Sequence, residues 1–192
     1  ANSFGGKELV FIPQTENGRF IDTEGNLLEA QRCAGGYEVL VDVKPFAVTT
    51  IDFQLNEYAD SEVPFELTMN GIETPYYRIA WNDNGQLVTL FDKEANRSVL
   101  KEGQEGNVLE IYEDKPNDCD AWNIEIFAYE KMQKATLICK PEIVSCGALK
   151  AVVRFSYRYH LSTFTQDMIV YRDSKRIDFK THADWHETHK LL

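Results

Sequence analysis

Three histidines near the C-terminal end have a spacing that could bind a metal ion. His182, His186 and His189 follow the pattern H-x3-H-x2-H. On a helix, residues four apart share a face and could chelate zinc. The surrounding sequence instead indicates strand and irregular chain, where such residues do not converge. The metalloprotease motif also needs glutamate directly after the first histidine, where Ala183 stands. We therefore expect surface or hydrogen-bonded histidines.

A second group of reactive side chains lies in the acidic stretch 113–123. Asp114, Asp118 and Asp120 could supply paired carboxylates for glycoside chemistry, or oxygen ligands for calcium. The calcium-loop pattern needs a glycine at its sixth position and a late glutamate, and neither is in register. Trp122 could complete a sugar surface, because hydroxyls bond carboxylates while the apolar sugar face stacks on the ring. A solvated loop and a buried core tryptophan remain the alternatives.

Strands must position both groups, because no segment longer than a turn or two shows a helical period. The N-terminal part contains alternating or β-branched runs at a spacing of about ten residues, typical of a small sandwich or barrel. We expect about five strands there, at places that include 4–12, 20–21, 37–43 and 48–53. Further strands are expected at 76–81, 86–91, 108–112, 124–129, 136–139, 142–146, 149–160, 162–171 and 176–180, and 65–69 could add one more.

The predicted organisation is all-β and antiparallel, in two pieces. Residues 1–55 form a small β domain, the turn-rich stretch 56–75 is a linker, and 76–192 form a second β region. The hairpin within 76–91 is the clearest element, since Asn82-Asp83-Asn84-Gly85 supplies turn residues that tolerate a positive φ.

Composition excludes several classes of partner. The 192 residues carry a formal net charge of −11, which argues against a nucleic-acid-binding surface. No apolar run reaches the roughly 20 residues of a membrane helix, and we expect no membrane partner. The four cysteines form no CxxC pair, and Cys139 and Cys146 stand in strand-like contexts, so buried thiols and a cytoplasmic origin are expected. The sequence has no GxSxG nucleophile motif of the α/β-hydrolases, no phosphate-binding loop, no dinucleotide-binding fingerprint and no kinase signature.

Several stretches, taken together, resemble one family. They are 76–79 (YYRI) with 85–94 (GQLVTLFDKE), 113–117 (EDKPN) with 120–124 (DAWNI), and the closing 174–179 (SKRIDF), 184–187 (DWHE) and 189–192 (HKLL). They resemble the C-terminal β region of glycoside hydrolase family 38, the α-mannosidases. Residues 22–31 and 43–46 are similar to the small β domain that precedes it. Asn123, Thr188 and the segment 11–13 depart from the family pattern, and Asn123 puts in doubt an acidic role at that position.

The resemblance implies a small antiparallel β domain followed by part of a galactose-mutarotase-like supersandwich. Family members are retaining enzymes that hydrolyse terminal α-mannosyl residues of glycans, and a zinc ion in their active site binds the sugar hydroxyls. Their nucleophile, acid/base carboxylate and zinc ligands come from an N-terminal α/β barrel and the region just after it. The resemblance therefore implies that this chain has no catalytic residue and no metal ligand, that zinc is bound outside it, and that alone it is inactive. Its partners would be the parent chain's barrel and mannose-containing glycans.

The resemblance also suggests which residues face that barrel. We expect the candidates to line the substrate cleft or pack on the barrel: Asp114, Asp120, Trp122, Asp184, Trp185, His186 and His189. Core packing and loop hydrogen bonds are the alternative role.

Two other function classes stay open. A free-standing carbohydrate-binding module would use Trp122 and the acidic loop as its binding face. A mutarotase-like epimerase would use His182 or His186 with Glu187 as base and acid. The apolar run that closes at Leu192 suggests a piece of a larger protein, with a strand edge that could pair with another copy.

Overall fold

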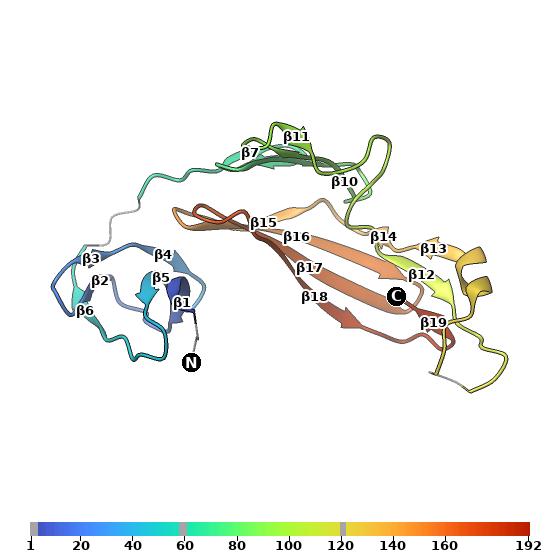
Figure 1. Ribbon diagram of the computed structural model, residues 1–192, viewed down its shortest axis with the longest axis horizontal. Helices are drawn as coiled ribbons and strands as arrows, with labels where there is room; N and C mark the ends of the chain where they lie inside the picture. Colours follow the sequence, from blue (N-terminus) through green and yellow to red (C-terminus); the bar gives the residue numbers. More distant parts are fainter. Residues whose placement is uncertain (1–3, 58–60, 120–121) are drawn as a thin grey trace.

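The computed structural model describes residues 4–57, 61–119 and 122–192, which form two bodies (Figure 1). Every strand pairing among these residues is antiparallel, which confirms the predicted all-β class. The one helical element in this part of the chain is a short 3-10 helix, η1 (Ile126–Glu130). No helix among the described residues is long and apolar enough to cross a membrane.

Two three-stranded sheets make up the small domain. One has the order β1 (Gly6–Ile12), β5 (Gly36–Val43), β4 (Ala30–Cys33), and the other β3 (Leu27–Leu28), β2 (Gly18–Asp22), β6 (Ile51–Leu55). The described part of this domain thus has six strands where about five were expected. The sequence analysis did not assign the stretch that forms β3 and β4, and β6 begins only at Ile51.

The core of the small domain is the predicted alternating face of β5. Tyr37, Val39 and Val41 are buried on it, together with Phe20 from β2. The Phe20 and Tyr37 rings pack edge to face with centroids 5.3 Å apart. The Tyr37 hydroxyl donates a hydrogen bond of 3.1 Å to the backbone oxygen of Glu16, which satisfies its polar end.

The upper layer of the large domain is a five-stranded sheet in the order β11-β10-β9-β8-β7. Its strands are β7 (Glu66–Thr68), β8 (Gly71–Glu73), β9 (Tyr77–Trp81), β10 (Leu87–Asp92) and β11 (Arg97–Ser98). The predicted hairpin is present, with Gly85 at φ 75° in its turn. β7 and β8 lie within 56–75, the stretch assigned to the linker, but β7 pairs with β8 and β8 pairs with β9. The division of the chain into two domains and a linker remains a prediction.

The lower layer has the order β14-β16-β17-β18, with β15 also paired to β16. Its strands are β14 (Thr136–Leu137), β15 (Glu142–Cys146), β16 (Lys150–Tyr159), β17 (Ser162–Tyr171) and β18 (Ile177–Asp184). β18 continues four residues beyond its expected end at Lys180, because it stays paired with β17 as far as Asp184.

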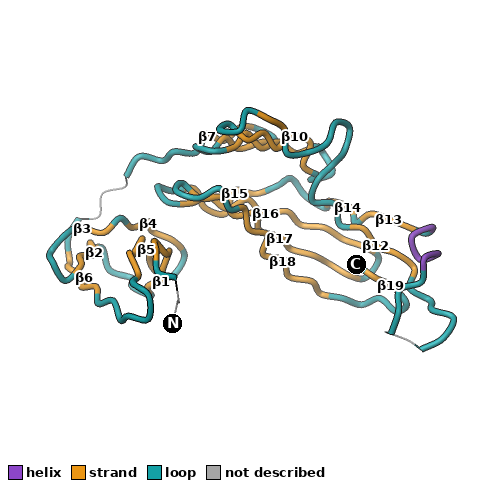
Figure 2. Tube along the Cα trace, in the orientation of Figure 1, coloured by secondary structure: helices purple, strands orange, loops and turns teal. Residues whose placement is uncertain are grey.

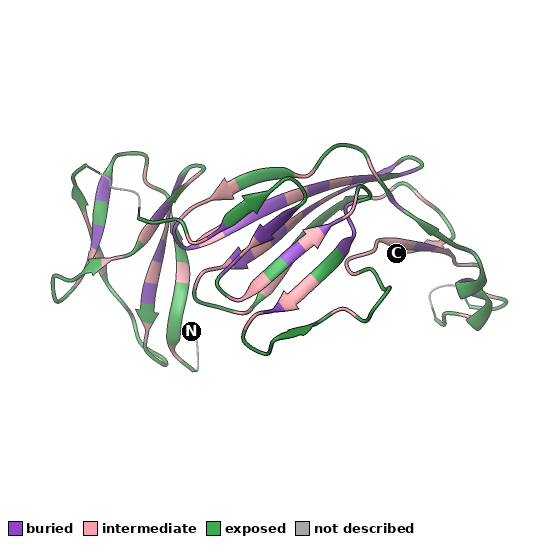
Figure 3. Ribbon diagram, turned by 90° about the horizontal axis from the view of Figure 1, so that it is seen from above, coloured by how far each residue is buried: buried purple, intermediate pink, exposed green. Residues whose placement is uncertain are grey.

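The two layers enclose the main core (Figure 3). Trp81 of β9 packs edge to face on Phe155 of β16, with centroids 5.4 Å apart. The buried Tyr157 hydroxyl donates a 3.0 Å hydrogen bond to the Gly85 backbone oxygen and so fixes the hairpin turn on the lower layer. Of the two thiols expected in strands, Cys146 is half-buried against this core, but Cys139 is exposed because β14 ends at Leu137.

A small sheet closes the far end of the large domain, with η1 beside it (Figure 2). It has the order β13 (Met132–Lys134), β12 (Glu110–Glu113), β19 (Lys190–Leu191). The strand predicted at 124–129 is wrong, because most of this run forms η1. Ala128 is its one buried residue, while Ile124 and Ile126 remain exposed.

Candidate functional site

The acidic stretch and the C-terminal segment meet at one end of the large domain (Figure 1). β12 pairs with β19 so that Glu113 lies opposite Lys190. The Asp114 backbone N–H donates a 2.8 Å hydrogen bond to the His189 backbone oxygen. The two parts of the sequence chosen for their reactive side chains therefore share one surface.

In the acidic loop, Trp122 has 86% of its surface exposed. The alternative of a buried core tryptophan is therefore wrong. The Trp122 backbone N–H donates to the Cys119 backbone oxygen at 3.2 Å, and Cys119 has φ 49°. Asp114 is half-buried and Asp118 is exposed, while Asp120 lies outside the described residues.

The C-terminal candidates divide into packing and surface roles. Trp185 is half-buried and packs edge to face on Phe164, with centroids 6.1 Å apart, so it supports the core. The exposed His186 has its Nε2 3.0 Å from Asp184 Oδ1. Its backbone N–H donates to Ser162 Oγ at 2.9 Å.

Glu187 and His182 take different positions from the His186–Asp184 pair. The Glu187 carboxylate accepts hydrogen bonds from Ser162 Oγ at 2.9 Å and the Leu161 N–H at 3.2 Å, which holds the β16–β17 turn. His182 is exposed on β18, opposite Thr165. Within the described residues, no three His, Cys, Asp or Glu side chains form a group that could hold a metal ion.

An exposed apolar surface lies next to these candidates, and we call it the η1 patch. It comprises Trp122, Ile124, Ile126, Phe127 and Tyr129. Ile126 has 85% of its surface exposed, and the Tyr129 ring packs on Tyr112 of β12 with centroids 5.3 Å apart. The sequence analysis named Trp122 as a candidate but missed the other four residues of the patch, because it assigned 124–129 to a strand. Several large apolar side chains exposed along one segment are typical of a surface that contacts another body.

Charged side chains border the patch. Glu113 Oε1 lies 2.7 Å from Lys115 Nζ, and its Oε2 lies 2.5 Å from Lys131 Nζ. Hydrogen bonds from these two ammonium groups lower the pKa of Glu113 to about 2. Glu113 is therefore held as a carboxylate that accepts from both lysines, which suits it to fixing the local structure rather than to transferring protons.

Comparison with known proteins agrees with this architecture. The model of the family described as "Glycosyl hydrolases family 38 C-terminal domain" matches residues 72–192. Alpha-mannosidase G of Dictyostelium discoideum is 37% identical over 128 residues, which are 63% of this chain and 12% of that protein. Alpha-mannosidase 2C1 of Homo sapiens is 27% identical over 120 residues, 60% of this chain and 11% of that protein.

Among solved structures, an alpha-mannosidase from Enterococcus faecalis V583 has a similar fold. The TM-score is 0.61 at 12% sequence identity, over 98% of this chain and 29% of that one. The chain thus spans about a tenth of the length of the curated relatives it matches. Because the family model matches more than half of the chain, residues 72–192, the chain belongs to glycosyl hydrolase family 38 and contains its C-terminal domain.

Proposed function

We propose that this chain is a non-catalytic β region of a zinc-dependent, retaining α-mannosidase that hydrolyses terminal α-mannosyl residues of glycans. The family match and the two α-mannosidase relatives support this proposal. In this proposal, the parent's catalytic domain packs on the end of the large domain where the acidic loop and the C-terminal segment meet. This end of the large domain then forms part of the wall of the active site.

The observation that carries the proposal is the exposure of the η1 patch. Trp122 and Ile126 expose large apolar side chains to water, at 86% and 85% of their surfaces. They belong to the same end of the large domain as the hydrogen-bonded pair Asp114 and His189. An exposed tryptophan among apolar side chains, bordered by charged groups, has the composition of an interface hot spot. The occupant we propose is the catalytic domain of the same parent chain.

In this proposal, zinc is bound by the parent enzyme outside this chain. The Asp184–His186 pair supplies two potential ligands, and no third His, Cys, Asp or Glu among the described residues joins them. These residues therefore do not fit a structural or catalytic zinc, which needs at least three protein ligands. We propose that the parent binds it elsewhere.

The same proposal places the enzyme in the cytoplasm. All four cysteines are free, which suits a reducing compartment.

The test is substitution within the parent enzyme. Trp122→Ala and Ile126→Ser should each lower kcat/KM for an aryl α-mannoside by about tenfold, since truncating an interface anchor removes on the order of 1–2 kcal/mol of docking energy. Met69→Ser is the matched control, because Met69 is 91% exposed on the β7–β8 turn. Unchanged kinetics and unchanged stability for both patch variants would reject the proposed packing.

A further inference from the structure

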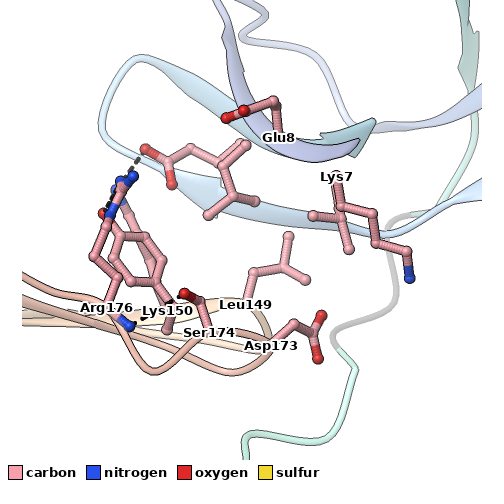
Figure 4. A pocket seen from close by; sticks show the side chains of 11 residues that line it. Lys7, Glu8, Leu149, Lys150, Asp173, Ser174 and Arg176 are labelled. Atoms are coloured by element: carbon pink, nitrogen blue, oxygen red, sulfur yellow. Dashed lines mark hydrogen bonds and ion pairs between the residues drawn. The ribbon is translucent and has the colours of Figure 1, made fainter. Parts of the chain in front are cut away.

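A pocket of about 330 Å³ lies between the small domain and the large domain (Figure 4). Its volume falls within the range of about 300–1,000 Å³ common for small-molecule sites, which favour domain interfaces. The face of β1 and β5 opposite to the one that packs the small core forms most of one wall. The start of β16 and the β17–β18 turn form the other wall.

The two walls are held together by direct contacts, so the pocket is largely pre-formed. The buried Gln31 side chain accepts hydrogen bonds from the Leu149 and Lys150 N–H groups, both at 2.9 Å, and donates to the Lys150 backbone oxygen at 3.1 Å. Arg172 and Glu29 form an ion pair across the same boundary. A ligand would meet a site whose shape is already fixed, which limits the entropy lost on binding.

Glu38 is the feature that points to a ligand. Its Oε1 accepts from Lys150 Nζ at 2.6 Å across the pocket. Its Oε2 is buried and has no hydrogen-bond partner among the described residues. A buried carboxylate oxygen without a donor is unfavourable. Because Glu38 lines the pocket, a ligand O–H or N–H that reached this carboxylate would satisfy it.

The charges of the walls indicate a neutral ligand. Three cationic side chains are balanced by three anionic ones: Lys7, Lys150 and Arg176 against Glu8, Glu38 and Asp173. Most of these side chains already form ion pairs within the protein. Arg176 pairs with Asp178, and Asp173 pairs with Arg172. An anion would face the carboxylates, and a metal cation would face the ammonium groups.

Apolar surface is also present in the pocket, from Leu9, Leu40 and Leu149. Ser174 and the charged groups supply donors and acceptors beside it (Figure 4). Hydroxyl groups that both donate and accept, on a ring with apolar C–H faces, match this mixture. The geometry points to this pocket as a binding site for a neutral monosaccharide. No residue of the η1 patch lines it, so this inference does not depend on the proposed function.

The test is a titration of the ¹⁵N-labelled protein with D-mannose and, in parallel, D-glucose, followed by amide chemical shifts. We expect saturable shifts at Leu149, Lys150 and Ser174, with a dissociation constant in the millimolar range for at least one sugar. Glu38→Gln should weaken this binding at least tenfold, because one of the two carboxylate oxygens becomes an NH2 group, which donates and cannot accept from the sugar. Glu66→Gln, an exposed change on β7, should leave it unchanged.

Leu40→Phe provides a second test that leaves Glu38 and its ion pair intact. The larger ring should fill the pocket and abolish the shifts, which keeps the inference testable if Glu38→Gln fails to fold. Three results would overturn the inference: no saturable shift with either sugar, the same dissociation constant in the wild type and Leu40→Phe, or tighter binding of inorganic phosphate than of both sugars.

Discussion

Gln31 shows how one side chain can join two domains. It is 4% exposed and makes three hydrogen bonds to the backbone of residues 149 and 150. Gly147 allows this close approach, because a Cβ there would lie 2.4 Å from the Gln31 Cδ. Any larger residue at 147 would push the Gln31 side chain out of its position.

Replacing Gln31 by alanine should lower the free energy of unfolding by about 2–4 kcal/mol, since it leaves the buried Leu149 N–H without its acceptor. Urea unfolding measures this loss. Gln54→Ala is the matched control, because Gln54 is exposed and accepts one hydrogen bond from Arg19. A loss for Gln31→Ala no larger than the control's, about 0.5 kcal/mol or less, would show that these contacts do not hold the domains together.

Glu113 makes a pH-dependent contribution to stability. Its pKa is lowered from 4.5 to about 2 by Lys115 and Lys131. A carboxyl group with a lowered pKa stabilises the fold above its unfolded pKa, and the stabilisation is lost as pH falls through the folded value. Glu113→Gln should therefore destabilise the protein more at about pH 6 than at about pH 2, as measured by urea unfolding. An equal loss at both pH values would contradict this.

At the scale of elements, the β16–β17 hairpin is the central part of the large domain. Its ten-residue pairing runs from Lys150–Tyr171 to Tyr159–Ser162, and alternate residues point into the core. Arg154 and Asp167 form a cross-strand pair with two hydrogen bonds, of 2.7 and 2.9 Å. Both strands were predicted nearly to the residue, because alternation over ten residues is a local signal.

Replacing Met168, on this hairpin, and Met69, outside it, tests how strongly burial on the hairpin contributes to stability. Met168 of β17 is fully buried, whereas Met69 is almost fully exposed. Met168→Ala should lower the free energy of unfolding by about 2–5 kcal/mol, because it leaves a cavity in the core. Met69→Ala should change it by less than about 0.5 kcal/mol. Equal effects of the two changes would mean that the hairpin does not form the core.

Elements that depend on distant partners were the ones that sequence could not predict. β3 has two residues and exists only because β2 lies beside it. The run 124–129 has strand-like composition, yet most of it forms η1, with one inward side chain, Ala128. For the same reason the sequence named the acidic loop and the C-terminal segment as candidates, but it could not show that β12 and β19 bring them together.

At the scale of the whole molecule, the chain is two β bodies with a pocket between them and an apolar patch at the far end. Family motifs in the sequence predicted the fold class and the family. The interdomain pocket was not predicted, since its walls come from β1, β5, β16 and the β17–β18 turn, and no motif spans them. The patch and the pocket lie on different elements, so docking and sugar binding can be tested separately.

The most direct test of the proposed function is hydrolysis of 4-nitrophenyl α-D-mannopyranoside by this 192-residue chain and by the parent enzyme, assayed in parallel. We predict turnover by the parent, a reduced rate in its Trp122→Ala variant, and no turnover by the chain alone. Turnover by the purified chain, at a rate that Trp122→Ala leaves unchanged, would contradict a non-catalytic role.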